Sequence, residues 1–251
     1  MFFDTHTHLD DEKFDTDRDE VIASFADEGL TLAVNIGANI KTSAASIALA
    51  EKYDFIYAAV GVHPNDVGDM TDADLAQIEE WTKHPRVVAI GEIGLDYHYD
   101  FSPREIQKDI FEKQLILANE LDLPVIVHDR ESHQDTLDLL TKYRPKGVVH
   151  CFSGSAQMAQ EIVKLGMYIG LGGAVTFKNA RKPLEVAQSI PLDRLLLETD
   201  APYMSPVPFR GKRNDSSLIP YTAEKIAEVR GESAQFIIDT ATENGKRLFG
   251  I

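Results

Sequence analysis

The sequence has a single cysteine, Cys151, and no run of about 18 apolar residues, the length that a membrane-spanning helix requires. One cysteine excludes a framework of internal disulfides. The first residues also lack the basic stretch and apolar segment of a secretory signal. From these absences we expect a cytoplasmic protein with no membrane segment, and no feature of the sequence indicates an obligate protein partner.

Positive charge is scarce. The chain has 25 Lys and Arg against 41 Asp and Glu, a formal net charge of −16. This balance argues against broad electrostatic binding to DNA, which needs a basic surface. It does not exclude a nucleic-acid substrate, because clustered carboxylates can belong to a metal site, where a bound divalent cation reverses the local field.

No linker rich in Pro, Gly or Ser divides the 251 residues, so we expect one domain over residues 1–251. Short apolar runs predict eight strands: Phe2–His8, Thr31–Ile36, Ile56–Gly61, Val87–Glu92, Val125–His128, Val148–Cys151, Tyr168–Leu171 and Leu195–Glu198. Amphipathic stretches between and after them predict helices: Arg18–Glu28, Ala44–Lys52, Asp72–Trp81, Arg104–Glu120, His133–Tyr143, Gln157–Leu165, Pro183–Ser189, Thr222–Val229 and Ala234–Arg247. This alternation is typical of a parallel sheet covered by helices and predicts an α/β fold, a TIM-like (β/α)8 barrel. A doubly wound open sheet is the alternative.

Ionisable residues gather at the predicted strand ends, where chemistry sits in such a barrel. Five of the eight histidines lie there, together with two carboxylates: His6, His8, His63, His128, His150, Glu92 and Asp200. One histidine at a strand end is usually only a satisfied polar group, but the set together suits a divalent metal ion. His6 and His8 also share a strand face, because side chains at i and i+2 project together.

Seven short segments carry a resemblance to a known family. DTHTHLD, GVHP, GEIGLDY, PVIVHDR, HCFSG, GLGG and ETDAPY follow one another in the order and spacing of the TatD family, metal-dependent deoxyribonucleases of the amidohydrolase superfamily. The similarity runs from Phe2 to the closing ENGKRLFGI. The resemblance implies a TIM-like barrel with a two-metal centre.

The resemblance also implies a role for each matched residue. His6 and His8 match the first metal pair, Glu92 the carboxylate that bridges both ions, and His128 and His150 the ligands of the second ion. Asp200 matches the carboxylate that binds the first metal and takes the proton of the attacking water. His63 matches a histidine close to the substrate. The expected cofactor is two divalent metal ions per chain, Mg, Mn or Zn, and Glu92 and Asp200 are the expected catalytic residues.

A phosphodiester substrate needs positive charge outside the metal pair. The segment PVPFRGKRND after the eighth strand offers Arg210 and Lys212, and the loops after the last two strands are the usual phosphate site of this barrel. In the family this loop usually brings a proline sooner than Pro220 does here, which leaves the role of residues 210–220 open. Aromatic residues in or beside the predicted loops either seal the barrel mouth, which we favour, or stack on bases: Tyr97, Tyr99, Phe152, Phe177 and Tyr203.

Three functions remain in competition. The leading hypothesis is a divalent-metal-dependent hydrolase that cleaves phosphodiester bonds, a DNase acting on single-stranded DNA from its 3′ end, by the family resemblance. The alternative is hydrolysis of another ester or an amide, such as an aminoacyl-tRNA bond, by the same centre. A non-catalytic scaffold is the third, although a scaffold has no need of all six metal-site residues. We interpret Cys151 as a buried structural thiol that faces away from His150.

Overall fold

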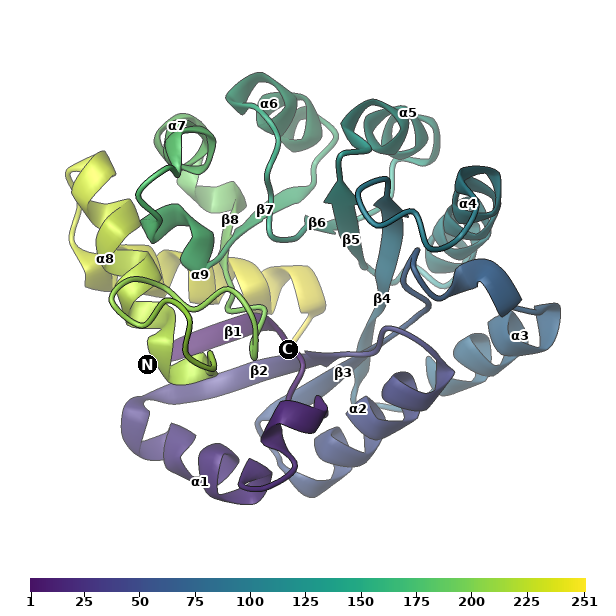
Figure 1. The fold of residues 1–251 in the computed structure, drawn as a ribbon, viewed down its shortest axis with the longest axis horizontal. Helices are drawn as coiled ribbons and strands as arrows, with labels where there is room; N and C mark the ends of the chain where they lie inside the picture. The colour runs from purple at the N-terminus through teal and green to yellow at the C-terminus, as the bar shows by residue number, and fades with distance from the viewer.

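The strands and helices alternate along the chain and wrap into a ring, with the strands inside and the helices outside (Figure 1). The computed structural model describes residues 1–251. The strands are β1 (Phe2–Thr7), β2 (Leu30–Ile36), β3 (Ile56–Val60), β4 (Val87–Asp96), β5 (Val125–Arg130), β6 (Gly147–Val149), β7 (Tyr168–Leu171) and β8 (Leu195–Leu197). The helices are α1 (Arg18–Glu28), α2 (Ile40–Lys52), α3 (Asp72–Trp81), α4 (Arg104–Glu120), α5 (His133–Tyr143), α6 (Ala156–Lys164), α7 (Arg181–Ser189), α8 (Ile219–Arg230) and α9 (Ala234–Phe249).

The sheet has eight strands in sequence order, and every neighbouring pair is parallel. The first and last strands meet just past their ends, where the amide of His8 donates to the carbonyl of Ala201 at 2.8 Å. The amide of Asp200 likewise donates to the carbonyl of His6 at 2.9 Å. The predicted TIM-like (β/α)8 barrel, nearly closed and in one domain, is therefore confirmed, and the open-sheet alternative is not.

The barrel interior is a packed apolar core. A cluster of 11 buried residues draws at least one side chain from each of the eight strands. Phe249, at the end of α9, joins this cluster and packs against Phe3 with ring centroids 6.0 Å apart. The closing helix thus packs on the barrel. An apolar interior leaves polar chemistry to the loops at the ends of the strands.

Along three strands, the interior-facing positions change from apolar to polar residues toward the carboxyl end, because every second side chain faces the same side. Ile126 lies in the interior cluster, and His128 follows two residues later on the same strand. Val148 and Leu196 lie in the same cluster and are followed, at the same spacing, by His150 and Glu198. Apolar residues therefore fill the interior, and the polar side chains above them stand at the carboxyl ends of the strands.

Three element boundaries differ from the prediction by three residues or more. Helix α2 begins at Ile40 instead of Ala44, because the side chain of Asn39 accepts a hydrogen bond from the amide of Thr42 and caps the helix. Strand β4 continues beyond Glu92 to Asp96 by pairing with β5. Helix α8 begins at Ile219, with Pro220 in its first turn, where its missing amide hydrogen costs nothing.

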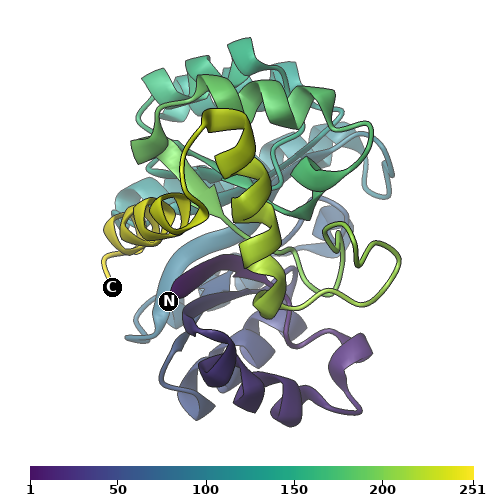
Figure 2. The same ribbon diagram turned by 90° about the vertical axis from the view of Figure 1, so that its left-hand side faces the viewer.

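The chain termini lie together at one end of the barrel, away from the long loop over residues 201–218 (Figure 2). This loop follows β8, so it belongs to the carboxyl ends of the strands. Its buried Asn214 donates from its side chain to the carbonyls of Thr199 and Tyr203, at 2.9 and 2.6 Å. No helix is both long and apolar enough to cross a membrane.

Candidate metal centre

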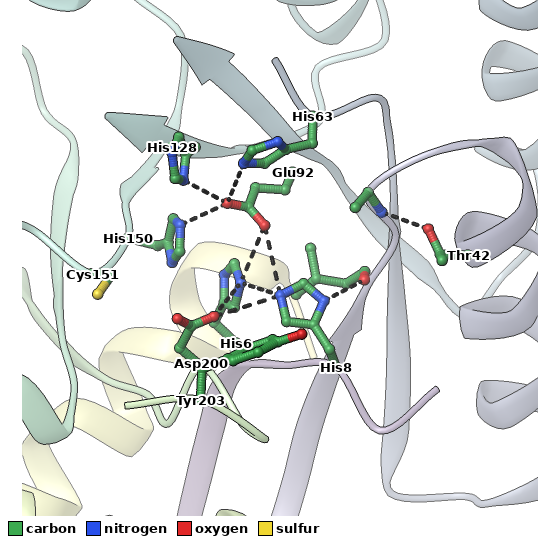
Figure 3. Close-up of polar contacts among 12 residues, drawn as sticks. His6, His8, Thr42, His63, Glu92, His128, His150, Cys151, Asp200 and Tyr203 are labelled. Atoms are coloured by element: carbon green, nitrogen blue, oxygen red, sulfur yellow. Dashed lines mark hydrogen bonds and ion pairs between the residues drawn. The ribbon is translucent and has the colours of Figure 1, made fainter. Parts of the chain in front are cut away.

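A cavity of about 1300 Å³ opens among the carboxyl ends of the strands. Its lining includes side chains from most of the strand ends that the sequence singled out: His8, His63, Glu92, His128, His150 and Asp200. His6 lies just beneath them and is fully buried. The fold thus brings together all seven ionisable residues that were predicted at strand ends (Figure 3).

The first group of candidate ligands faces one oxygen of Glu92. The Nε2 atoms of His6 and His8 each lie 3.6 Å from Glu92 Oε2, and 3.7 and 3.6 Å from Asp200 Oδ1. The two Nε2 atoms are 3.1 Å apart. Ligands bound at about 2.1 Å around one tetrahedral cation stand about 3.4 Å apart, so these four atoms have the spacing of a ligand set.

The second group faces the other oxygen of the same carboxylate. His150 Nε2 lies 2.8 Å and His128 Nδ1 2.9 Å from Glu92 Oε1, with His63 Nε2 at 3.5 Å. Glu92 is 4% exposed and stands between the two groups (Figure 3). One carboxylate that offers an oxygen to each group has the geometry of a bridging ligand, as the resemblance implied.

Two of the ring nitrogens that point away from Glu92 are also held. His128 Nε2 lies 3.1 Å from Asp96 Oδ2, and His8 Nδ1 lies 3.0 Å from the carbonyl oxygen of Ile36. Metal-bound histidines commonly direct their second nitrogen at a carboxylate or a carbonyl, which fixes the tautomer and the ring plane. Asp96 was not among the predicted site residues, because it lies beyond Glu92, where the predicted strand ended, although it belongs to the GEIGLDY segment.

His63 differs from the other histidines in its hydrogen bonding. The amide of Asn65 donates to His63 Nδ1 at 3.1 Å, which leaves the proton of the neutral ring on Nε2. Burial, with the neighbouring charge of His128, lowers the pKa of His63 to about 3, so the ring is neutral at pH 7. A protonated Nε2 donates hydrogen bonds and does not bind a metal, and the substrate-side role of His63 stays a prediction.

Burial and the charges of neighbouring groups shift the pKa values of these residues, some downward and some upward. Burial, with the charge of His150, lowers the pKa of His6 to about 4. Burial also opposes charge on His8 and His128, but nearby carboxylates outweigh it and raise both pKa values to about 9. Burial would raise the pKa of Glu92, yet the surrounding histidines hold it well below its usual range. The carboxylate of Glu92 is therefore ionised.

Buried polar atoms without hydrogen-bond partners are a further observation that fits a metal centre. His6 Nδ1, His150 Nδ1 and Glu198 Oε2 are buried and have no hydrogen-bond partner. His6, His150 and Glu198 also form one of three groups whose ligand-type atoms lie within 4.8 Å of one another. The others are His6, His8 and Glu92, and His63, Glu92 and His128. Buried polar atoms without partners are costly, and an ordered water or a cation held by the group of His6, His150 and Glu198 would relieve that cost.

Glu198 and Asp4 are buried carboxyl groups that the sequence analysis did not single out. Burial raises the pKa of Glu198 to about 8, and its Oε1 accepts a hydrogen bond from the amide of Cys151. Asp4 accepts from the hydroxyls of Thr199 and Ser216, at 2.6 and 2.7 Å, and from the amide of Thr199 at 3.0 Å. Asp4 therefore ties β1 to the segment that carries Asp200.

The interpretation of Cys151 as a buried thiol on a strand is wrong. Strand β6 ends at Val149, so strand alternation does not reach Cys151. The backbone at Cys151 instead has a φ of 41°, and the residue is partly exposed in the lining of the cavity. Asp200 has a similar left-handed φ of 56°. Such conformations are uncommon outside glycine and often mark functional sites.

The basic loop after β8 was predicted to bind substrate through Arg210 and Lys212, but these two side chains lie outside the cavity. Arg210 and Lys212 are exposed, and neither lines the cavity. Their neighbour Arg213 is held by two 2.7 Å contacts to the carboxylate of Asp17, which draws the segment toward α1. The guanidinium of Arg210 packs over the ring of Phe177, 4.1 Å from its centroid. A role for Arg210 and Lys212 in substrate binding stays a prediction.

The cations that do line the cavity come from other elements. They are Arg18, Lys41 and Arg130. Arg18 is occupied by backbone carbonyls, including that of Leu9 at 2.7 Å. Lys41, in the first turn of α2, and Arg130, at the end of β5, have no carboxylate within 4.0 Å and make no side-chain hydrogen bond within the protein. No motif in the sequence distinguished these two from surface cations.

Comparison with known proteins agrees with this geometry. A family model described as TatD related DNase matches residues 3–250. An uncharacterized metal-dependent hydrolase, YabD of Bacillus subtilis, is 49% identical and covers 100% of both chains. A protein of Escherichia coli named 3′-5′ ssDNA/RNA exonuclease TatD is 37% identical over 99% of each chain. The crystal structure of YJJV, a TatD homolog from Escherichia coli, superposes with a TM-score of 0.93 at 36% identity and covers 100% of this chain and 98% of that one.

Proposed function

The chain belongs to the TatD family of metal-dependent hydrolases, and from that premise we propose that it hydrolyses phosphodiester bonds of single-stranded nucleic acid, removing nucleotides from a 3′ end. One observation carries the proposal. Two groups of nitrogen and carboxylate atoms stand on opposite oxygens of Glu92, at the base of a cavity whose lining includes two unpaired cations.

The proposed centre uses the six residues implied by the resemblance. His6, His8, Glu92, His128, His150 and Asp200 would hold two divalent ions, with Glu92 shared between them. Imidazole nitrogen favours Zn or Mn over Mg, and the carboxylates accept all three. When bound, such a pair of ions supplies Lewis acidity to a phosphoryl oxygen and lowers the pKa of a water molecule.

Asp200 and His63 would then handle the proton of the water molecule and bind the phosphate. Asp200 lies at the cavity wall, where burial would raise its pKa, but the neighbouring histidines, with His8 Nε2 3.6 Å away, lower it. An ionised Asp200 would accept a proton from the attacking water. His63, neutral with its proton on Nε2, would donate a hydrogen bond to a phosphate oxygen.

Charge placement favours a phosphate-bearing substrate. Lys41 and Arg130 line the cavity without anionic partners, although the chain carries a net charge of −16. An ester or amide without phosphate would leave these two cations with no counterpart in the substrate. The relatives named 3′-5′ ssDNA/RNA exonuclease support the polarity and the single-stranded preference. The cytoplasmic location expected from the composition stays a prediction.

The test is digestion of 5′-labelled single-stranded and duplex DNA and RNA, by purified protein supplied with Mg²⁺, Mn²⁺ or Zn²⁺. We expect stepwise shortening of the single strands from the 3′ end. A Glu92→Ala variant purified in parallel should leave the label at full length, since it lacks the shared ligand.

Two results would contradict the proposal. Equal shortening by Glu92→Ala would show that the activity comes from a contaminant or another site. Intact substrate with every metal would contradict the nuclease hypothesis. It would favour hydrolysis of another ester or an amide, such as an aminoacyl-tRNA bond. Hydroxamate formation or release of labelled amino acid is the direct assay for that activity.

A further inference from the structure

We propose that Tyr99 and Phe101, with the guanidinium of Arg130, form a platform that binds an unpaired nucleobase beside the candidate metal centre. The platform lies in the loop between β4 and α4. The inference rests on the proposed function for its ligand, and it adds the subsite that holds the substrate strand by its bases.

The two rings form an exposed pair with a stacking geometry. Tyr99 is 49% exposed and Phe101 72% exposed, and neither belongs to the hydrophobic core. Their centroids are 5.3 Å apart, and their planes are inclined by only 22°. Because no core packing accounts for two exposed aromatic side chains in contact, they are available to a planar ligand.

A cation accompanies the rings on the side of the cavity. The guanidinium of Arg130 lies 4.9 Å from the ring centroid of Tyr99. Both residues line the same cavity as Glu92 and His128. Because Arg130 has no acidic partner, its charge is free for a phosphate, and Phe101, which is 72% exposed and stacked on Tyr99, offers a ring face to a base. Aromatic rings interleaved with positive charge are the usual means of binding single-stranded nucleic acid.

The other aromatic residues that the sequence nominated are occupied. Phe152 is buried, and Phe177 is covered by Arg210. The hydroxyl of Tyr97 is bonded to Asp135 at 2.6 Å. Tyr203 lines the cavity and is 44% exposed, but its hydroxyl is bonded to Asp11 at 2.8 Å and no second aromatic ring stacks on it. Among these five aromatic residues, Tyr99 is the one that is both exposed and stacked on a second exposed ring.

The loop that carries the platform is fixed to the metal centre. Asp96 Oδ1 accepts hydrogen bonds from the amides of His98 and Tyr99, both at 2.9 Å. The other oxygen of Asp96 lies 3.1 Å from His128 Nε2. The side chain of Gln107 donates to the carbonyl of Ser102 at 2.8 Å. The rings are therefore held in place before a ligand arrives, which lowers the entropic cost of binding.

The experiment measures binding separately from cleavage. Fluorescence anisotropy is recorded for a labelled oligothymidylate with phosphorothioate linkages, and for an abasic strand of the same length and linkages. The proteins are the metal-supplemented wild type, the double variant Tyr99→Ala/Phe101→Ala, Tyr99→Phe, and Phe236→Ala. Phe236 is 47% exposed on α9 and serves as a matched aromatic control. Metal content and melting temperature, which these exposed positions should not change, check folding.

We expect the wild type to bind the oligothymidylate about 10-fold or more tightly than the abasic strand, the size that stacking of a base on an aromatic side chain implies. The double variant should lose this preference, and Tyr99→Phe and Phe236→Ala should keep it. Equal binding of both strands by the wild type, or a preference that survives in the double variant, would overturn the platform.

The outcomes separate the two proposals. Cleavage of single-stranded DNA without any base preference in binding leaves the nuclease and removes the platform. Base-dependent binding that the double variant loses, without cleavage under any metal, keeps the platform and removes the nuclease. Neither binding nor cleavage removes both.

Discussion

At the scale of single residues, the candidate centre depends on where each side chain meets Glu92. Its two oxygens face two separate groups of ligand atoms, at 2.8 to 3.6 Å. Asp200 belongs to the first group and stands at the cavity wall in a left-handed backbone conformation. Glu92 therefore has the position of a shared ligand, and Asp200 that of a ligand that can also move a proton.

Replacing Asp200 by Asn should reduce turnover strongly while preserving the fold. Asn keeps the shape of the side chain but has no negative charge and cannot accept the proton, so we expect kcat to fall by roughly 10²- to 10⁴-fold, the usual contribution of a general base. Metal content and melting temperature, measured on the same sample, separate loss of the base from loss of a metal. Near-normal turnover would remove Asp200 from the mechanism.

At the scale of elements, the barrel closes where β1 meets the end of β8, and Asp4 holds that junction. Its carboxylate is fully buried and accepts hydrogen bonds from Thr199 and Ser216 and, at 3.2 Å, from the amide of His6. The strand ends that carry His6 and Asp200 are thus fixed by one side chain beneath the cavity.

Replacing Asp4 by Ala should destabilise the fold and loosen the centre. The change leaves buried donors without an acceptor, and we expect a loss on the order of 3 kcal/mol in the free energy of unfolding. Asp4→Asn, which keeps an acceptor oxygen, should lose less. Urea denaturation measures both variants, and an Asp4→Ala protein as stable as the wild type would show that the junction does not depend on this carboxylate.

The sequence predicted the elements well and their junctions less well. Alternating apolar runs and helical stripes depend on local periodicity, which is why the barrel and the histidines at its strand ends could be predicted. Asp96 was missed because it joins β4 only through pairing with β5. Cys151 was misplaced because the strand ends two residues before it. Lys41 and Arg130 look like surface cations until the fold brings them to one cavity.

At the scale of the whole molecule, a strongly acidic chain gathers carboxylates and imidazoles in the middle of its fold. Burying these ionisable groups together costs free energy of folding. The buried atoms of His6, His150 and Glu198 that have no hydrogen-bond partner add to that cost. Ions bound at the centre would offset this cost only in the folded state, because the ligands come from strands far apart in sequence. Metal binding should therefore be coupled to global stability.

Removing metal with a chelator should lower the melting temperature of the wild type. A ligand present at about 100 times its dissociation constant stabilises the native state by about 2.7 kcal/mol, a difference that calorimetry detects easily. Adding back Mn²⁺ or Zn²⁺ should restore the transition. The Glu92→Ala variant should respond much less to either treatment, and an equal response in both proteins would place the stabilising ions elsewhere.

The most direct test of the metal centre is a metal count by mass spectrometry on purified protein equilibrated with Mn²⁺ or Zn²⁺ and then freed of loosely bound ions. The geometry around Glu92 predicts two ions per chain in the wild type and a loss of at least one in Glu92→Ala. A wild type that holds no metal after supplementation, or a Glu92→Ala variant that holds as much as the wild type, would contradict the account.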